Sequence, residues 1–233
     1  MKFSKTSLLI LFLTASFMSI NAQSKTKSYT LKKGQAFDIL FLGTKPETKE
    51  KLQNYFKTVF PVAEKVGYHS LPGYKIEETP TQGNYHPQAM ILGYWDNLQG
   101  RKEFLKKIEE VMPDFHQERR NIWSSFNLTY YELKEDLSFD INPEKFNIVT
   151  AYWKKDNSSI KKFKQEWVQN VKNTGGQIRL ELMDGNSPFG YYHNPDYLVI
   201  TEWKDKAAFN KFYTKNLEMN HSSIKHVNQF QIK

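Results

Sequence analysis

The sequence predicts an α+β fold made of two tandem copies of one unit, which follow an N-terminal signal peptide. A basic and then apolar N-terminus, a constant shift of 108 residues between two long segments, and an apolar periodicity common to both segments support this prediction. The 233 residues contain no cysteine, so a disulfide scaffold, a thiolate metal site and a cysteine nucleophile are excluded.

The N-terminal segment has the pattern of a secretory signal peptide. Lys2 and Lys5 precede the almost wholly apolar run 8–20, and the small residue Ala22 stands before polar residues. The apolar run is too short for a membrane span, so we expect a signal peptide over 1–22 and a periplasmic or secreted protein. An uncleaved N-terminal anchor is the alternative. No later stretch of the sequence is apolar enough to span a bilayer.

Positive charge is spread along the chain. Without Lys2 and Lys5, 31 of the 33 basic residues remain, against 25 acidic residues. A short run of lysines on a helix is typical of a solvated face, and the sequence holds no nucleic-acid recognition motif. We therefore expect no nucleic-acid partner.

The internal repeat aligns turn residues, strand ends and helix residues with one shift. Near the C-terminus the shift falls from 108 to 99, which predicts about nine extra residues in the first copy after its second helix. A period of this size indicates a duplicated domain, with the two copies at 35–134 and 145–233. The aligned pairs are Leu52 with Ile160, Tyr55 with Phe163, Val59 with Trp167, Gly67 with Gly175, Pro80 with Pro188, Pro87 with Pro195, Trp95 with Trp203, and Phe104 with Phe212.

In the first copy, apolar residues that alternate predict strands, and apolar residues spaced by three and four predict helices. Gly67 follows the first helical pattern, as a helix-ending glycine does. The expected elements are a strand at 37–41, a helix at 52–66, a strand at 71–78, a strand that ends at Trp95, a helix through 104–111 and a strand at 127–133.

The second copy repeats this order, and its first helix ends at Gly175. Its expected elements are a strand at 146–152, a helix at 160–171, a strand at 177–183, a strand that ends at Trp203, a helix through 208–213 and a strand at 227–232. The order β-α-β-β-α-β is that of the ferredoxin-like unit. Its helices cover one sheet face, so we expect the other faces to meet in an internal pseudo-dimeric α/β barrel. A further homo-oligomer stays open.

The segment from Asp196 to Phe209 is similar to the third strand and second helix of the dimeric α/β-barrel superfamily. The first copy, with its segments 93–101 and 130–133 and with Trp123, resembles the NIPSNAP branch of that superfamily. The superfamily also includes antibiotic-biosynthesis-type and haem-degrading monooxygenases. The resemblance covers essentially the whole mature chain and implies the fold, with monooxygenase-like chemistry as one activity.

The haem-degrading branch uses an asparagine on the first strand, a tryptophan on the second helix and a histidine near the end of that helix. The resemblance therefore implies Asn147 and His221 as catalytic residues, with haem as cofactor and His221 as its ligand. Phe212 stands at the tryptophan position, and Ile39 replaces the asparagine in the first copy, so at most one copy would bind haem. The alternative is a structural role for Asn147 and His221.

Aromatic and histidine residues near the expected intersheet space are candidates for ligand binding. Large aromatic residues at strand ends are most often core residues. The functional alternative is a cavity between the two sheets that binds a small apolar or aromatic molecule, with a histidine at its rim as a base or hydrogen-bond donor. The candidate ligand-binding residues are Trp95, Trp203, Phe212, Tyr152, Tyr197, His86 and His193.

No sequence motif assigns a metal or another reaction. His116 lies near Glu109, Glu110 and Asp114 without the spacing of a metal site, so we expect no metal and a solvated surface there. Two functions remain open. One is an exported small-molecule-binding α/β-barrel protein, in one form a monooxygenase-like or haem-handling enzyme. The other is a non-catalytic envelope or stress-associated interaction protein with the same fold.

Overall fold

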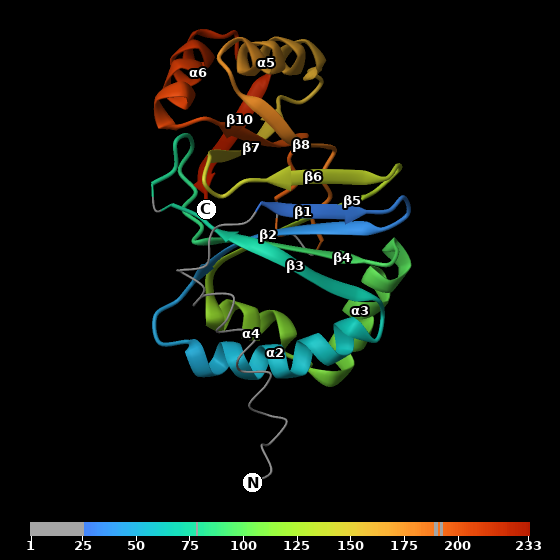
Figure 1. Ribbon diagram of the computed structural model, residues 1–233. Helices are drawn as coiled ribbons and strands as arrows, with labels where there is room; N and C mark the ends of the chain where they lie inside the picture. Colours follow the sequence, from blue (N-terminus) through green and yellow to red (C-terminus); the bar gives the residue numbers. More distant parts are fainter. Residues whose placement is uncertain (1–25, 78, 189–190, 192) are drawn as a thin grey trace.

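The computed structural model describes residues 26–77, 79–188, 191 and 193–233. The expected signal peptide, 1–22, lies outside the described residues. Two four-stranded antiparallel sheets face each other, and helices cover the outer side of each sheet (Figure 1). Among the described helices, none has both the length and the apolar character needed to cross a bilayer. The expected α+β class is confirmed.

The first unit runs from Ala36 to Glu132. Its sheet has the order β3-β4-β2-β5, which the β-α-β-β-α-β connection produces. Gly67 ends the first helix with a φ of 85°, a left-handed conformation that glycine adopts without steric cost. The elements are β2 (Ala36–Thr44), α2 (Lys49–Glu64), β3 (Tyr68–Lys75), β4 (Ala89–Trp95), α3 (Leu98–Val111), α4 (Phe115–Ile122) and β5 (Trp123–Glu132).

The second unit runs from Phe146 to Ile232 and has the equivalent strand order, β10-β7-β9-β8. Gly175 follows its first helix with a φ of 84°, as Gly67 does in the first unit. The elements are β7 (Phe146–Lys154), α5 (Lys161–Asn173), β8 (Gln177–Met183), β9 (Tyr197–Trp203), α6 (Lys206–Glu218) and β10 (Ile224–Ile232).

Helix α4 occupies the place where the change of shift predicts extra residues in the first copy. Phe115, Arg119 and Ile122 are its buried residues, and their spacing of four and three places them on one face. The ring of Phe115 stacks on Tyr55 of α2 at a centroid distance of 5.9 Å. The helix passes directly into β5, since Trp123 is both its C-cap and the first residue of the strand.

A two-stranded ribbon, which the sequence analysis did not predict, joins the units along one side. β1 (Lys27–Leu31) pairs with β6 (Leu137–Ile141), a strand that lies in the expected linker. The hydroxyl of Tyr29 donates to the carbonyl of Pro72 and bonds the hydroxyl of Tyr74, both on β3, while β6 contacts β8. The ribbon therefore lies between the β3 edge of one sheet and the β8 edge of the other (Figure 1).

On the opposite side, each unit sends its central loop across to the last strand of the other unit. In the loop between β8 and β9, Asn186 exchanges two backbone hydrogen bonds with Tyr130 on β5. In the loop between β3 and β4, Gln82 accepts a backbone hydrogen bond from Gln229 on β10. A loop of the other unit thus bridges the outer edge of β5 and of β10, which reduces the strand edge available for pairing with another chain.

Side chains fill the space between the sheets. One buried apolar cluster contains residues of both sheets and of the ribbon, such as Phe41, Phe139, Ile200 and Phe230. Two surface pockets of the described part of the molecule, described below, lie outside this space. Buried side chains of both sheets and of the ribbon thus pack where the sequence analysis expects an apolar cavity.

Candidate functional site

The aromatic candidates lie on the helix side of their sheets, which corrects their expected place. Trp95 packs in the core beneath α2 and α3, and its indole Nε1 donates to Asp38 at 2.9 Å. Trp203, Phe212, Tyr152 and Tyr197 all belong to the core beneath α5 and α6. Along β9, Leu198 and Ile200 face the intersheet core instead. Every residue of β9 is buried, so the sequence offers no polar face from which to read the orientation of the strand.

The two residues implied for haem chemistry are not brought together. On β7, Ile148 and Tyr152 face the helices while Val149 faces the intersheet core, so alternation places Asn147 on the intersheet side. There its side-chain amide donates to the carbonyls of Asn142 and Lys145, within the turn that precedes the strand. His221 lies on the helix side, with its ring 5.3 Å from that of Phe163.

The described residues of the second unit do not fit a haem between its sheet and helices. Apolar and aromatic side chains, among them Trp167 and Phe209, fill this space. The imidazole Nε2 of His221 is buried without a partner, but the ring is fixed through a contact of 2.8 Å between Nδ1 and the Met219 carbonyl. Asn147, on the other face of the sheet, cannot donate to a group bound by His221. We therefore derive no step through haem.

Of the two histidines expected at the rim, His86 is exposed and His193 is buried between the sheets. The hydroxyl of Thr129, on β5, donates to the His193 carbonyl and also lies 2.8 Å from the imidazole Nδ1. The hydroxyl hydrogen is thus used, so Nδ1 must carry the ring proton, and Nε2 keeps a free electron pair. Nε2 is buried without a hydrogen-bond partner.

Aromatic rings surround the imidazole of His193. Phe41 and Trp153 have ring centroids 5.1 Å away, and Tyr85 lies at 6.2 Å. Burial is the main cause that lowers the pKa of His193 to about 4; a hydrogen bond to the backbone acts against it, and the neighbouring His226 acts in the same direction as burial. His193 is therefore a neutral residue. It helps to close one end of the barrel, where its ring lies near that of Tyr85, so the β8–β9 loop meets the β3–β4 loop there.

A second group of polar residues forms a pocket of about 590 Å³ in the first unit. We call it the Arg119 pocket. Helix α4, the start of β5 and the loop between β8 and β9 build it. It is lined by His116, Arg119, Arg120, Trp123, Ser124, Ser125, Phe126 and Tyr191.

Arg119 is the buried centre of this pocket, with only 6% of its surface exposed. Its Nε donates to the hydroxyl of Tyr55 at 2.8 Å, and Nη1 donates to the hydroxyl of Tyr191 at 2.9 Å. The guanidinium carbon lies 3.9 Å from the ring centroid of Phe115 and 4.3 Å from that of Phe126, in cation–π geometry. No carboxylate among the described residues pairs with Arg119.

The neighbours of Arg119 do not neutralise its charge. Burial raises the pKa of Tyr55, so its hydroxyl stays protonated. His116 lies 3.2 Å from the Tyr191 hydroxyl through Nδ1 and 3.5 Å from Glu109 through Nε2. Burial and the nearby Arg119 lower the pKa of His116. A buried guanidinium whose side-chain partners are phenol hydroxyls and aromatic rings still carries its positive charge and attracts an anion.

A β-bulge shapes the floor of the pocket. Gly43 on β2 pairs with Ser125, but the next residue, Thr44, pairs with Trp123, so Ser124 is the extra residue in β5. A Cβ atom at Gly43 would lie 2.8 Å from the Ser125 Oγ and 2.9 Å from the Ser124 Oγ. Glycine at this position therefore makes room for the two hydroxyls.

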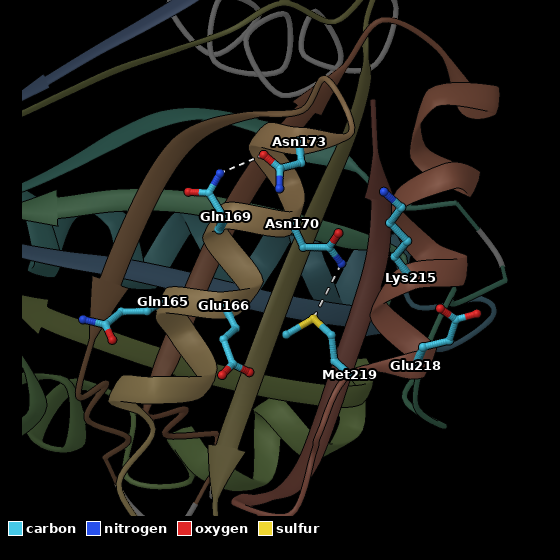
Figure 2. Close-up of a pocket in the computed structure, with 8 residues that line it drawn as sticks. All are labelled: Gln165, Glu166, Gln169, Asn170, Asn173, Lys215, Glu218 and Met219. Atoms are coloured by element: carbon cyan, nitrogen blue, oxygen red, sulfur yellow. Dashed lines mark hydrogen bonds between the residues drawn. The ribbon is translucent and has the colours of Figure 1, made fainter.

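A second, more open groove of about 600 Å³ lies between α5 and α6 in the other unit. Figure 2 shows that mostly amide and charged side chains line it, with Asn170 bonded to the sulfur of Met219. No cluster of His, Asp or Glu among the described residues is arranged to hold a metal. The Arg119 pocket is the better candidate, because it combines a buried charge with aromatic walls.

The Arg119 pocket was missed by the sequence analysis, which expects a solvated surface around His116. Arg119 and Tyr191 are 72 residues apart and come from different units. The one available signal was the extra segment of the first copy, which breaks the repeat where α4 now stands.

The sequence matches no family model and no curated protein. Among solved structures, a candidate monooxygenase from Fusobacterium nucleatum has 13% identity and a TM-score of 0.41, over 87% of this chain and 93% of that one. An anthrone oxidase-like protein has 13% identity and a TM-score of 0.47, over 88% and 94%. Chlorite dismutase from Candidatus Nitrospira defluvii has 9% identity and a TM-score of 0.46, over 87% and 92%.

Likeness at this level transfers neither an activity nor the role of a residue to this chain. The fold itself is read from the strand order and the facing sheets. Two β-α-β-β-α-β units whose sheets face each other across a shared core agree with the fold that the resemblance implies.

Proposed function

We propose that this chain is an exported small-molecule-binding α/β-barrel protein whose ligand site is the Arg119 pocket. The observation that carries the proposal is the buried guanidinium of Arg119, which lines a pocket of about 590 Å³ and has no carboxylate partner among the described residues. A binding site normally combines a mostly apolar concave surface with a few convergent polar groups. Trp123, Phe126 and Tyr191 supply the apolar surface, and Arg119 supplies the central polar group.

Export rests on the sequence pattern of residues 1–22, which the structure does not describe. The expected mature chain starts four residues before β1. N-terminal sequencing of the protein secreted by its host tests this part, and a chain that still begins at Met1 would contradict it.

Calorimetric titration with a panel of small aromatic molecules, both neutral and anionic, tests the site. We expect saturable binding of at least one compound at millimolar concentration or below. Ser125→Trp places an indole inside the pocket and should abolish this binding. Ser222→Trp is the matched control, since Ser222 is exposed in the second unit. Binding that survives Ser125→Trp, or a panel without any saturable binding, would overturn the proposal.

A more specific version of this proposal is a monooxygenase-like activity that uses the same pocket. Oxygen uptake in the presence of the compound identified by titration tests it directly. The haem-handling form is tested by adding haemin to the mature protein. We expect no Soret shift that depends on His221, because packed side chains occupy the space beside that residue.

A non-catalytic interaction protein is the second candidate. The side chains that fill the intersheet space favour it, since a core of this kind stabilises the duplicated fold without providing a cavity. Absence of any ligand for the Arg119 pocket would leave this candidate as the better one.

A further inference from the structure

We infer that the Arg119 pocket takes a small aromatic molecule that carries an oxyanion, and that Arg119 binds the oxyanion. This inference names the ligand class of the site and rests on the proposed function. The oxyanion is a carboxylate or a phosphate, two groups that share the same planar or near-planar pairing with a guanidinium.

The two buried arginines of the first unit differ in whether a carboxylate pairs with them. Arg101 is 3% exposed and pairs with the carboxylate of Asp38 at 2.7 Å. Arg119 is buried to a similar degree, but the described residues offer it two tyrosine hydroxyls and aromatic rings instead. A buried charge is usually paired, so the missing partner of Arg119 is expected to come from a ligand.

The hydrogen bonds that hold Arg119 leave one side of its fork available. Nε is used by Tyr55 and Nη1 by Tyr191, while Nη2 has no hydrogen bond to a described residue. The two bonds fix the plane of the guanidinium before any ligand arrives. Such preorganisation lowers the entropy cost of binding.

Aromatic walls adjoin this charge. Phe126 lies edge-to-face with Trp123 at a centroid distance of 5.0 Å and tilted against Tyr191 at 5.1 Å. Rings in this arrangement provide apolar faces and edges against which a ligand ring packs. The hydroxyls of Ser124 and Ser125, beside Gly43, add donors at the floor of the pocket.

The charge of the lining also favours an anion. Arg119 and Arg120 are both cationic, and none of the described residues that line the pocket is acidic. Burial, and then the nearby Arg119, lower the pKa of His116. A cation in this pocket would be repelled by Arg119 and Arg120, whereas a monoanion gains a charge-assisted hydrogen bond.

Three probes of similar size test the inference: benzoate, phenyl phosphate and the neutral benzyl alcohol. We expect benzoate to bind the wild-type protein at least about tenfold more tightly than benzyl alcohol, the gain of one hydrogen bond to a charged group. Comparison of benzoate with phenyl phosphate then identifies which oxyanion the pocket prefers. Calorimetric titration at a constant salt concentration gives the three dissociation constants.

Arg119→Gln should weaken benzoate binding by about 10- to 100-fold and leave benzyl alcohol within about twofold. Lys211→Gln is the matched control, because it removes one exposed positive charge on α6, outside the pocket. It should change benzoate binding by less than about threefold. If Arg119→Gln does not fold, Arg119→Lys is the second variant, which keeps the positive charge but loses the guanidinium that bonds both Tyr55 and Tyr191. The preference of the wild-type protein for benzoate over benzyl alcohol then tests the oxyanion inference without any variant.

The outcomes separate this inference from the proposed function. Equal binding of benzoate and benzyl alcohol, both lost in Ser125→Trp, would overturn the oxyanion inference and support the proposed site. Binding of all three probes that Ser125→Trp does not change would overturn both. A preference for benzoate that Arg119→Gln leaves intact would also overturn the role of Arg119.

Discussion

His193 is buried in its neutral form, and this links the stability of the barrel to pH. The folded-state pKa is about 4, below the ordinary value of 6.5, because burial disfavours the charged imidazole. Between these two values the unfolded chain binds more protons than the folded one, so the free energy of unfolding falls as the pH falls. Above a pH of about 6.5 this contribution no longer changes with pH.

We predict a loss of roughly 3 kcal/mol in the free energy of unfolding between pH 6.5 and pH 4 that is due to His193. Urea unfolding over this range measures it. His193→Phe keeps an aromatic ring in the same cage and removes the titrating group, so its pH profile should be flatter than that of the wild type. Equal slopes for the two proteins would show that His193 is not buried in neutral form.

The pair formed by Asp38 and Arg101 is structural, in contrast to Arg119. Arg101→Met leaves the buried Asp38 carboxylate with only the indole of Trp95, so we predict a loss of about 3 to 5 kcal/mol in the free energy of unfolding. The double variant with Asp38→Asn should recover part of this loss, since no buried charge is then left unpaired. A loss below about 1 kcal/mol for Arg101→Met would mean that the pair is hydrated in solution.

At the scale of elements, the ribbon of β1 and β6 replaces an edge-to-edge contact between the two sheets. Leu31 and Ile141 are fully buried in the intersheet core, although they come from segments outside the two repeats. Removal of side-chain volume there cannot be compensated by a helix, because the helices lie on the other faces of the sheets.

We predict that Leu31→Ala lowers the free energy of unfolding by about 2 to 5 kcal/mol, the cost of a cavity in a packed core. Lys33→Ala, at an exposed residue two positions later, should change it by less than about 0.5 kcal/mol. Urea unfolding of both variants provides the comparison. Equal stabilities would indicate that the ribbon is not docked in solution.

The elements that the sequence predicts are those with a strong period or a marked end. Gly67 and Gly175 end their helices as expected, and the strands that end at Trp95 and Trp203 have those bounds. β1 and β6 were missed because each has only five residues, too few to establish a period between charged neighbours.

The candidate site was less predictable than the fold, because contact between distant residues creates it. Tyr191 completes the pocket only when the second unit lies against the first. In the sequence, Arg119 cannot be distinguished from the other basic residues of a solvated helix. His193 was a candidate on account of its type and place, and the structure shows that it is buried between the sheets. The face on which Trp203 lies could not be read from a strand buried on both sides.

For the whole molecule, the shared core makes the two units one cooperative body. Leu198, Ile200 and Phe230 of the second unit pack in the same cluster as Phe37 and Phe41 of the first. Loss of one unit would expose the apolar sheet face of the other, so neither is expected to unfold alone.

We predict a single thermal transition for the intact two-unit protein, with equal calorimetric and van't Hoff enthalpies. Residues 145–233 expressed alone should aggregate or bind a hydrophobic dye, since their intersheet face has lost its partner. Two separate transitions in the intact protein would contradict this prediction. So would a soluble, monomeric and fully folded second unit.

The reciprocal crossing of the loops has a consequence for how the polypeptide is made. Translation proceeds from the N-terminus, so β5 is complete more than fifty residues before Asn186, its backbone partner, has been added. During that interval the nascent first half exposes the unpaired edge of β5 and the apolar face of its sheet. Both features promote association with neighbouring chains. The second half of the chain ends this interval once it has been made, so we expect association between partly made chains to be a hazard of this architecture during synthesis.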